Sequence, residues 1–414
     1  MAVIFVHGVN NRSEDPDYEA RRLLTAKFLE RYLRGAVING KTLAEPHAEF
    51  PYWGDLATRF RWNMRSLPSG DMDALGANVD PKLRPLIAVV REALDDSEAA
   101  GEQPLLAVAR RSFPRAVELT TELVLQENMP AVAAAERALF AIEAQLYGND
   151  FEPPRAPPAW LAGLATDAQF CSQLLQAIKS RSDAGLGPQA LGGSSAKLGA
   201  LVTAGATRLK QATQQVAETI LDRSGDFAST KILAWNRHSL NATLGRFFGD
   251  VFIYMDQRGR QGQPGPIPER LLQAWDQAIA ATPEEPVVIV GHSLGGVISY
   301  DLLSHFAQDR LVDLFVSVGS QVAHFEEMKL YRASRDDIPG AGGDQVAKPG
   351  NIKHWINVFD EVDIFSYSCK AVFEQVHDHP YDTRTYVVKA HGAYFEQPRF
   401  YERLRARIDQ LPVL

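Results

Sequence analysis

The sequence predicts an α/β protein, with a mostly parallel central sheet that is flanked by helices and interrupted by a large helical insertion. Short β-branched runs recur near both ends of the chain, and polar or glycine-containing loops follow them. Residues 81–235 are instead rich in Ala, Leu, Glu and Arg, a composition typical of helices. The length of 414 residues also exceeds the usual size of a single core. We therefore expect core residues 1–80, a helical insertion or cap over 81–235, and core residues 236–414.

The first element is the run AVIFV at residues 2–6, which we predict to be a buried parallel strand. The loop HGVNN follows at the carboxyl end of this strand, where binding and catalytic residues often lie in parallel α/β sheets. An amphipathic helix follows over 15–35, because the segment has an acidic first turn and ends at Gly35. A second strand is expected within 48–56.

Helix and strand alternate again after residue 236. Helices are predicted over 241–256, 269–281 and 295–308. Strands or strand-and-loop units are predicted at 287–290, 311–321, 354–365 and 383–392.

Composition excludes several classes of function. A formal net charge of −8 argues against a nucleic-acid-binding protein, because binding to phosphates needs a basic surface. The two cysteines, Cys171 and Cys369, have no spacing typical of a disulfide framework or a structural zinc site. The amino terminus lacks a basic region before its short apolar run, and no apolar stretch is long enough to span a membrane. We expect a cytoplasmic protein, with non-classical export left open.

The segment GHSLGG at residues 291–296 places a serine between two glycines, directly after an apolar strand and before a helix. In the pattern GxSxG the serine occupies a strained turn, where a β-carbon two residues away on either side would meet neighbouring elements. Ser293 is therefore the candidate nucleophile. The competing interpretation is an ordinary serine in a glycine turn.

A serine nucleophile needs a base, and in this type of fold the base follows the acid, which follows the serine. Among the downstream histidines, we expect only His391 to follow a late strand directly, namely TYVVKA, so it is the candidate base. His377 and His379 form an HxH pair that hints at a metal site, but no third ligand stands at a recognisable spacing. We therefore expect a polar loop there and no bound metal.

The segment WINVFDEVDIF supplies the candidate acid. Asp363 lies deeper in the loop after the predicted strand and has more freedom to reach a histidine, so we favour it. Asp360 lies nearer the strand and is the alternative acid. Whichever of the two is not the acid is expected to cap a helix or bind backbone amides.

Two backbone N–H groups are the candidate oxyanion donors. Leu294 follows the nucleophile at a helix amino terminus, where the helix dipole favours negative charge. Val9 follows Gly8, which allows the backbone of the first loop to pass close to a substrate. Asn10 and Asn11 are expected either to bind substrate or to cap the next helix.

These segments together resemble the α/β-hydrolase superfamily, and within it the serine lipase and esterase branch. The resemblance rests on FVHGVNN, GHSLGG, VSVGSQ, WINVFDEVDIF and HGAYF, and it covers about 1–65 and 240–414. It implies a catalytic triad of Ser293, His391 and Asp363, with Val9 and Leu294 as oxyanion donors. In relatives the acid commonly begins a triplet similar to Asp-Pro-Val, which the residues after Asp363 match only loosely, so Asp360 stays open.

The expected function is cofactor-independent hydrolysis of carboxylic esters through an acyl-enzyme. We expect a lipophilic acyl group, because a large helical insertion over the active-site mouth would create an apolar pocket. Phospholipase and thioesterase activity are alternatives, and the resemblance also extends to bacterial effectors and toxins. A catalytically vestigial binding or scaffold protein is the alternative from another class. The expected partner is a small-molecule or lipid ester and no nucleic acid; transient contact with a membrane and a protein partner for the insertion are left open.

Overall fold

The apolar runs of the sequence form a six-stranded sheet in which every paired strand is parallel. The strands lie in the order β10-β9-β8-β7-β1-β4. Their bounds are β1 Ala2–Val6, β4 Ala48–Glu49, β7 Val287–His292, β8 Val312–Val318, β9 Ile352–Phe359 and β10 His377–Pro380. The central strands β7 and β8 are almost entirely buried, as expected for a parallel sheet covered on both faces. Val288 pairs with both Val3 and Leu314, which brings the carboxyl ends of β1, β7 and β8 to the same side of the sheet. We call this side the carboxyl edge.

This computed structural model describes residues 2–62, 64–65, 83–94, 99, 101–126, 134–186, 195–221, 244–384 and 387–414. The chain divides into two units. The first comprises Met1–Ser13, Thr25–Phe60 and Thr243–Leu414, and the second comprises Glu14–Leu24 and Arg61–Ala242. The boundaries predicted after residues 80 and 235 lie outside the described residues.

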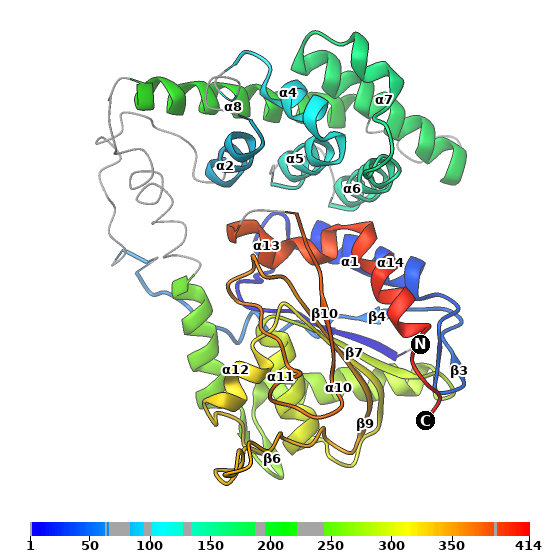
Figure 1. Cartoon of the computed structure of the whole chain (residues 1–414), viewed down its shortest axis with the longest axis vertical. Helices are drawn as coiled ribbons and strands as arrows, with labels where there is room; N and C mark the ends of the chain where they lie inside the picture. The colour runs from blue at the N-terminus through cyan, green and yellow to red at the C-terminus, as the bar shows by residue number, and fades with distance from the viewer. Residues whose placement is uncertain are drawn as a thin grey trace. The chain divides into compact units, whose positions relative to one another are not determined.

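Helices cover both faces of the sheet in the first unit (Figure 1). On one face lie α10 (Pro266–Ala281), α11 (Leu294–Asp301) and α12 (Val322–Glu327), and an unlabelled helix over 244–257 adds to the same apolar core. The other face carries the part of α1 (Tyr18–Leu33) from Thr25 on, with α13 (Val387–Ala393), a 3-10 turn η4 (Tyr394–Glu396) and α14 (Pro398–Ile408). Aromatic contacts join this second layer to the sheet, because Phe5 of β1 meets Phe395 with ring centroids 4.8 Å apart.

Most predicted elements are present, including the strand 2–6, the helix 15–35 and the strands around 287, 311 and 354. The helix predicted over 295–308 is α11 followed by a π-helical turn, η3 (Leu302–Phe306). The strand expected within 48–56 is reduced to the two residues of β4. Pro51 follows closely and has no N–H to extend the ladder, so the chain turns away.

The strand predicted at 383–392 is wrong. Residues 387–393 form α13, and the edge strand is instead β10, whose sequence HDHP has no apolar alternation. The β-branched pair Val387 and Val388 favours a strand by propensity, but Ala390, Ala393 and Tyr394 are buried at helical spacing. Burial of that helical face overrides the local preference. The HxH pair expected in a polar loop therefore lies in a strand.

The described residues of the second unit are helical and contain no strand. Besides the part of α1 up to Leu24, its described helices are α2 (Arg84–Ala93), α4 (Pro104–Arg111), α5 (Phe113–Gln126), α6 (Ala134–Asn149), α7 (Asp167–Leu186) and α8 (Ser195–Leu221), with a 3-10 turn η2 (Ala159–Gly163). Phe113 packs edge-on against the rings of Tyr147, Phe151 and Trp160. The Asp167 carboxylate accepts the Leu106 backbone N–H at 2.8 Å, so the start of α7 caps α4. Two small antiparallel hairpins complete the described elements, β2–β3 (Val37–Ile38, Lys41–Thr42) and β5–β6 (Gly259–Arg260, Gln263–Pro264).

Candidate active site

Ser293 occupies the turn between β7 and α11, at the carboxyl edge of the sheet. Its backbone has φ 54° and ψ −128°, a region that non-glycine residues rarely adopt and that is characteristic of strained functional turns. The neighbouring strand holds this backbone in place. The Ser293 N–H donates to the Val318 carbonyl at 3.0 Å, and the Ser320 hydroxyl donates to the Ser293 carbonyl at 2.7 Å.

The two glycines that flank the serine are required by close backbone contacts. A β-carbon at Gly291 would lie 2.6 Å from the Gly296 Cα, and one at Gly295 would lie 2.1 Å from the Val6 carbonyl oxygen. Real β-carbons do not approach backbone atoms this closely, so the turn excludes any side chain at these positions. The predicted steric reason for the GxSxG pattern is therefore present in the structure.

The structure brings Ser293, His391 and Asp363 into one hydrogen-bonded chain. His391 Nε2 lies 2.8 Å from Ser293 Oγ. Its other ring nitrogen, Nδ1, lies 3.0 and 2.9 Å from the two carboxylate oxygens of Asp363. In the tautomer with hydrogen on Nδ1, the imidazole donates to the carboxylate and accepts from the serine hydroxyl. This is the geometry in which an imidazole can act as general base.

Two further contacts orient Asp363. The Tyr394 hydroxyl donates to Asp363 Oδ2 at 3.0 Å, and the Phe365 N–H donates to Oδ1 at 3.0 Å. Asp360, the alternative acid, has different partners. It accepts the backbone N–H and hydroxyl of Thr383 at 2.8 and 2.6 Å and the Val362 N–H at 3.0 Å. Its contacts are those of a loop-stabilising carboxylate.

His292 precedes the candidate nucleophile and contacts the candidate base. Its Nε2 donates to the His391 backbone carbonyl at 2.7 Å, and the two rings have centroids 4.9 Å apart. Burial lowers the pKa of His292 to about 3, and the nearby His391 contributes in the same direction. His292 is therefore neutral at physiological pH and adds no second positive charge beside His391.

The loop after β1, residues 7–13 (the β1 loop), passes directly beside the candidate nucleophile. A β-carbon at Gly8 would lie 2.6 Å from Ser293 Cβ and 3.2 Å from its Oγ, so only glycine permits this approach. Val9 follows in the loop, and Leu294 opens α11. Over the described residues, the backbone N–H groups of Val9 and Leu294 make no hydrogen bond within the protein. Both are free to donate to a ligand.

Buried polar contacts hold the β1 loop. Asn11 donates from its side chain to the carbonyls of Gly8 and Val9, both at 3.1 Å. The fully buried carboxylate of Asp250, on helix 244–257, accepts the Asn10 N–H at 3.0 Å and the Arg12 guanidinium at 2.7 Å. The expected capping role of the two asparagines is wrong, because the next helix begins at Tyr18 and both side chains support the loop itself.

His7 also serves this loop. Its Nδ1 donates to the Gly8 carbonyl at 2.9 Å, and its Nε2 accepts the Trp53 N–H at 3.1 Å. The Trp53 indole stacks on the imidazole at 4.8 Å and donates to the His7 carbonyl. Burial lowers the pKa of His7 to about 4, so the ring stays neutral and accepts this hydrogen bond at physiological pH.

The HxH segment has structural contacts. Asp378, between His377 and His379, accepts the backbone N–H groups of Cys369 and Lys370 at 3.0 and 2.9 Å. Within the described part of the chain, no three or more His, Cys, Asp or Glu residues form a group that could hold a metal ion.

The six-stranded parallel sheet, with helices on both faces, has the α/β-hydrolase fold. An α/β-hydrolase family model matches residues 228–408, which supports placing the chain in that superfamily and indicates hydrolytic activity. Comparisons with curated proteins and with solved structures found no match. Of the helices described, none is both long and apolar enough to cross a membrane.

Sequence reasoning missed three residues at the site. Tyr394 stands three residues after His391, a spacing that would place both on one helix face had 387–396 been predicted helical. The sequence indicates His292 only weakly, through its position directly before the candidate nucleophile. Asp250 carries no signal, because it lies 240 residues from the loop that it holds.

Proposed function

We propose that this protein is a serine hydrolase that cleaves carboxylic esters through an acyl-enzyme. The observation that carries the proposal is the continuous hydrogen-bonded chain from Ser293 through His391 to Asp363, at the carboxyl edge of a parallel sheet. The family match supports hydrolysis in general. The strained serine backbone and the two free N–H groups beside it support attack on a carbonyl carbon.

The mechanism follows from the contacts. His391 removes the Ser293 hydroxyl proton as the oxygen attacks the ester carbonyl, while Asp363 stabilises the imidazolium. The backbone N–H groups of Val9 and Leu294 bind the oxyanion of the tetrahedral intermediate. The intermediate collapses to the acyl-enzyme, and the alcohol leaves with the proton held by His391. Water then repeats the sequence, releasing the carboxylic acid and restoring the serine hydroxyl.

Labelling with a fluorophosphonate probe tests the nucleophile. We expect wild-type protein to be labelled at Ser293 and the variants Ser293→Ala and His391→Ala to lose labelling, as read by mass spectrometry of the modified peptide. Heat-denatured protein is the control for non-specific reaction. A native protein that is not labelled at Ser293 would exclude the serine-hydrolase proposal.

The same preparation distinguishes the two candidate acids. Asp363→Asn is expected to reduce the turnover of p-nitrophenyl butanoate by about 10⁴-fold, because the neutral amide no longer stabilises the imidazolium and favours the wrong imidazole tautomer. Asp360→Asn should retain most turnover and instead lower stability by about 1–3 kcal/mol, because it weakens the contacts with Thr383. The reverse pattern would assign the acid to Asp360. Phosphatidylcholine and acyl-thioester substrates in the same assay test the phospholipase and thioesterase alternatives.

A further inference from the structure

A row of aromatic rings leads from the candidate base to the protein surface. Phe365, in the loop of the candidate acid, lies 5.1 Å from the His391 ring and stacks on Phe247 at 4.6 Å, measured between ring centroids. Phe247 meets Phe248 at 5.6 Å, and Phe248 stacks on Phe252 at 6.4 Å. We call Phe365, Phe247, Phe248 and Phe252 the aromatic row.

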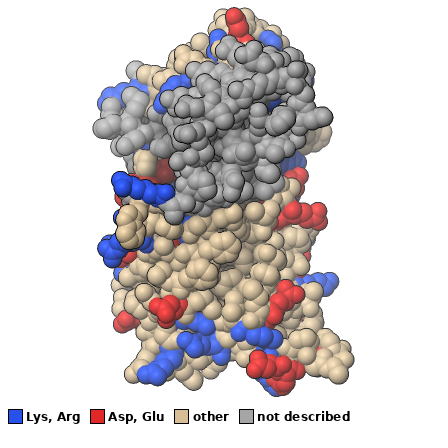
Figure 2. Space-filling view, turned by 90° about the vertical axis from the view of Figure 1, so that its left-hand side faces the viewer, with Lys and Arg blue, Asp and Glu red and all other residues tan. Residues whose placement is uncertain are grey.

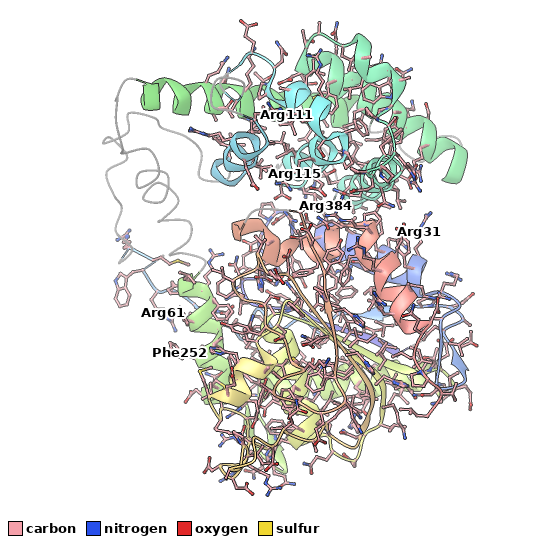
Figure 3. All side chains as sticks on the ribbon, viewed as in Figure 1. Arg31, Arg61, Arg111, Arg115, Phe252 and Arg384 are labelled. Atoms are coloured by element: carbon pink, nitrogen blue, oxygen red, sulfur yellow. The ribbon has the colours of Figure 1, made fainter. Side chains whose placement is uncertain are left out.

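The outer end of the aromatic row is exposed. Phe248 and Phe252 lie four residues apart on one face of helix 244–257 and are 50% and 68% exposed, whereas Phe247 is buried. Ile364, beside Phe365 in the acid loop, is 52% exposed. Phe252 is labelled in Figure 3 at the outer side of the helix, and Figure 2 shows the face on that side, where a broad area carries no charged side chains.

Buried polar groups hold the aromatic row in position. On the inner face of helix 244–257, Asp250 binds the β1 loop, and Tyr254 donates to the carboxylate of Asp301 at 2.8 Å. Asp301 ends α11, the helix that Ser293 opens. The Phe365 carbonyl also accepts a hydrogen bond from the side-chain amide of Gln321. The backbone that carries the rings is thus held in place, which reduces the entropy cost of binding an apolar ligand along them.

We propose that the aromatic row binds the acyl chain of the substrate ester, so that the enzyme prefers long acyl chains. The inference rests on the proposed function. The position of the aromatic row favours an acyl chain as its ligand. The inner end of the row contacts the candidate base, so a molecule that lies along the row would have its reactive group at Ser293. The row contains no charge or hydrogen-bonding side chain, so it fits a hydrocarbon chain and offers no partner for a polar one.

The test compares monomeric p-nitrophenyl butanoate and dodecanoate, with the second ester kept below its aggregation concentration. In the double variant Phe248→Ala/Phe252→Ala, we expect the ratio of kcat/KM for dodecanoate to that for butanoate to fall about tenfold, since apolar contact with the long chain is lost. The variant Phe248→Leu/Phe252→Leu should restore part of the ratio. Leu311→Ala is the matched control. Leu311 is 46% exposed and directly precedes β8, so it lies at the amino ends of the strands, whereas Ser293 lies at their carboxyl ends.

Three outcomes would overturn the inference. An unchanged ratio together with unchanged binding to phosphatidylcholine vesicles would mean that the acyl chain lies elsewhere. An equal loss with both esters would mean that the outer rings only support the catalytic centre. Loss of binding to phosphatidylcholine vesicles with an unchanged ratio would assign the surface to a membrane. If wild-type protein neither labels with the fluorophosphonate nor cleaves any ester, the proposed function itself fails and the inference fails with it.

Discussion

Several single residues at the site are required by close contacts with their neighbours. Gly8 is the clearest example, because the β1 loop passes so near Ser293 that any β-carbon would meet the side chain of this candidate nucleophile. His292 and Tyr394 contribute through hydrogen bonds to His391 and Asp363. Each of these residues acts on the position of a reactive group, so small displacements matter more for the rate than for stability.

The variant Gly8→Ala is expected to fold and to lose about 10²-fold in kcat/KM, because its β-carbon displaces either the β1 loop or the Ser293 side chain. The measurement is turnover of p-nitrophenyl butanoate together with thermal unfolding. Gly245→Ala is the control, since a β-carbon at Gly245 meets no atom within 4 Å. Equal activity of the two variants would show that the approach of Gly8 to Ser293 is not needed.

Among the secondary-structure elements, helix 244–257 links the parts of the candidate site. Its inner face carries Asp250, which binds the β1 loop, and Phe247, which packs on the acid loop. Its outer face carries the two exposed rings of the aromatic row. One element thus contacts the loop of the proposed oxyanion donors and the loop of the candidate acid, and it carries the exposed rings of the proposed acyl-chain surface.

Removing the Asp250 carboxylate should destabilise the protein strongly. The variant Asp250→Ala leaves the nearly buried Arg12 guanidinium without its carboxylate partner, and we expect the free energy of unfolding to fall by about 3–5 kcal/mol. Urea unfolding measures this change. Asp276→Ala removes an exposed ion pair with Arg310 and should cost less than about 1 kcal/mol. If both variants lower the free energy of unfolding by a similar, small amount, the role assigned to Asp250 is contradicted.

At the scale of the whole molecule, two histidines buried in neutral form make stability depend on pH. His7 and His292 have pKa values lowered to about 4 and about 3 by burial. In the unfolded chain both return to about 6.5 and bind protons below that pH. The unfolded state therefore binds more protons between these values, and stability falls as the pH is lowered through this range.

We expect the free energy of unfolding to decrease below about pH 6.5 by up to about 1.4 kcal/mol per pH unit for each of these histidines. Urea unfolding of wild-type protein and of His7→Gln at about pH 7 and about pH 5 tests this expectation. The variant should show a weaker pH dependence. His47→Gln, at an exposed position, should match wild type. Parallel pH dependences for wild type and His7→Gln would refute the assignment.

The sequence by itself determined the fold class and singled out the residues that the structure brings together. Apolar runs and the GxSxG spacing encode local geometry, because a buried strand needs continuous hydrophobic residues and the turn at Ser293 needs glycine on both sides. The chain order of serine, acid and base limited the candidates to residues after Ser293; position after a predicted strand then selected His391 and favoured Asp363 over Asp360, and their catalytic roles remain predictions. His391 was selected for a partly wrong reason, since it lies in α13 and not after a strand.

Only the tertiary structure decided the remaining features. The polar segment HDHP forms the edge strand because pairing with β9 and the contacts of Asp378 stabilise it. Asp363 contacts His391 while Asp360 binds Thr383, a distinction that depends on loop geometry and not on spacing. Asp250 and the aromatic row join segments more than 100 residues apart. Such contacts leave no local periodicity in the sequence, because they arise only when distant elements pack.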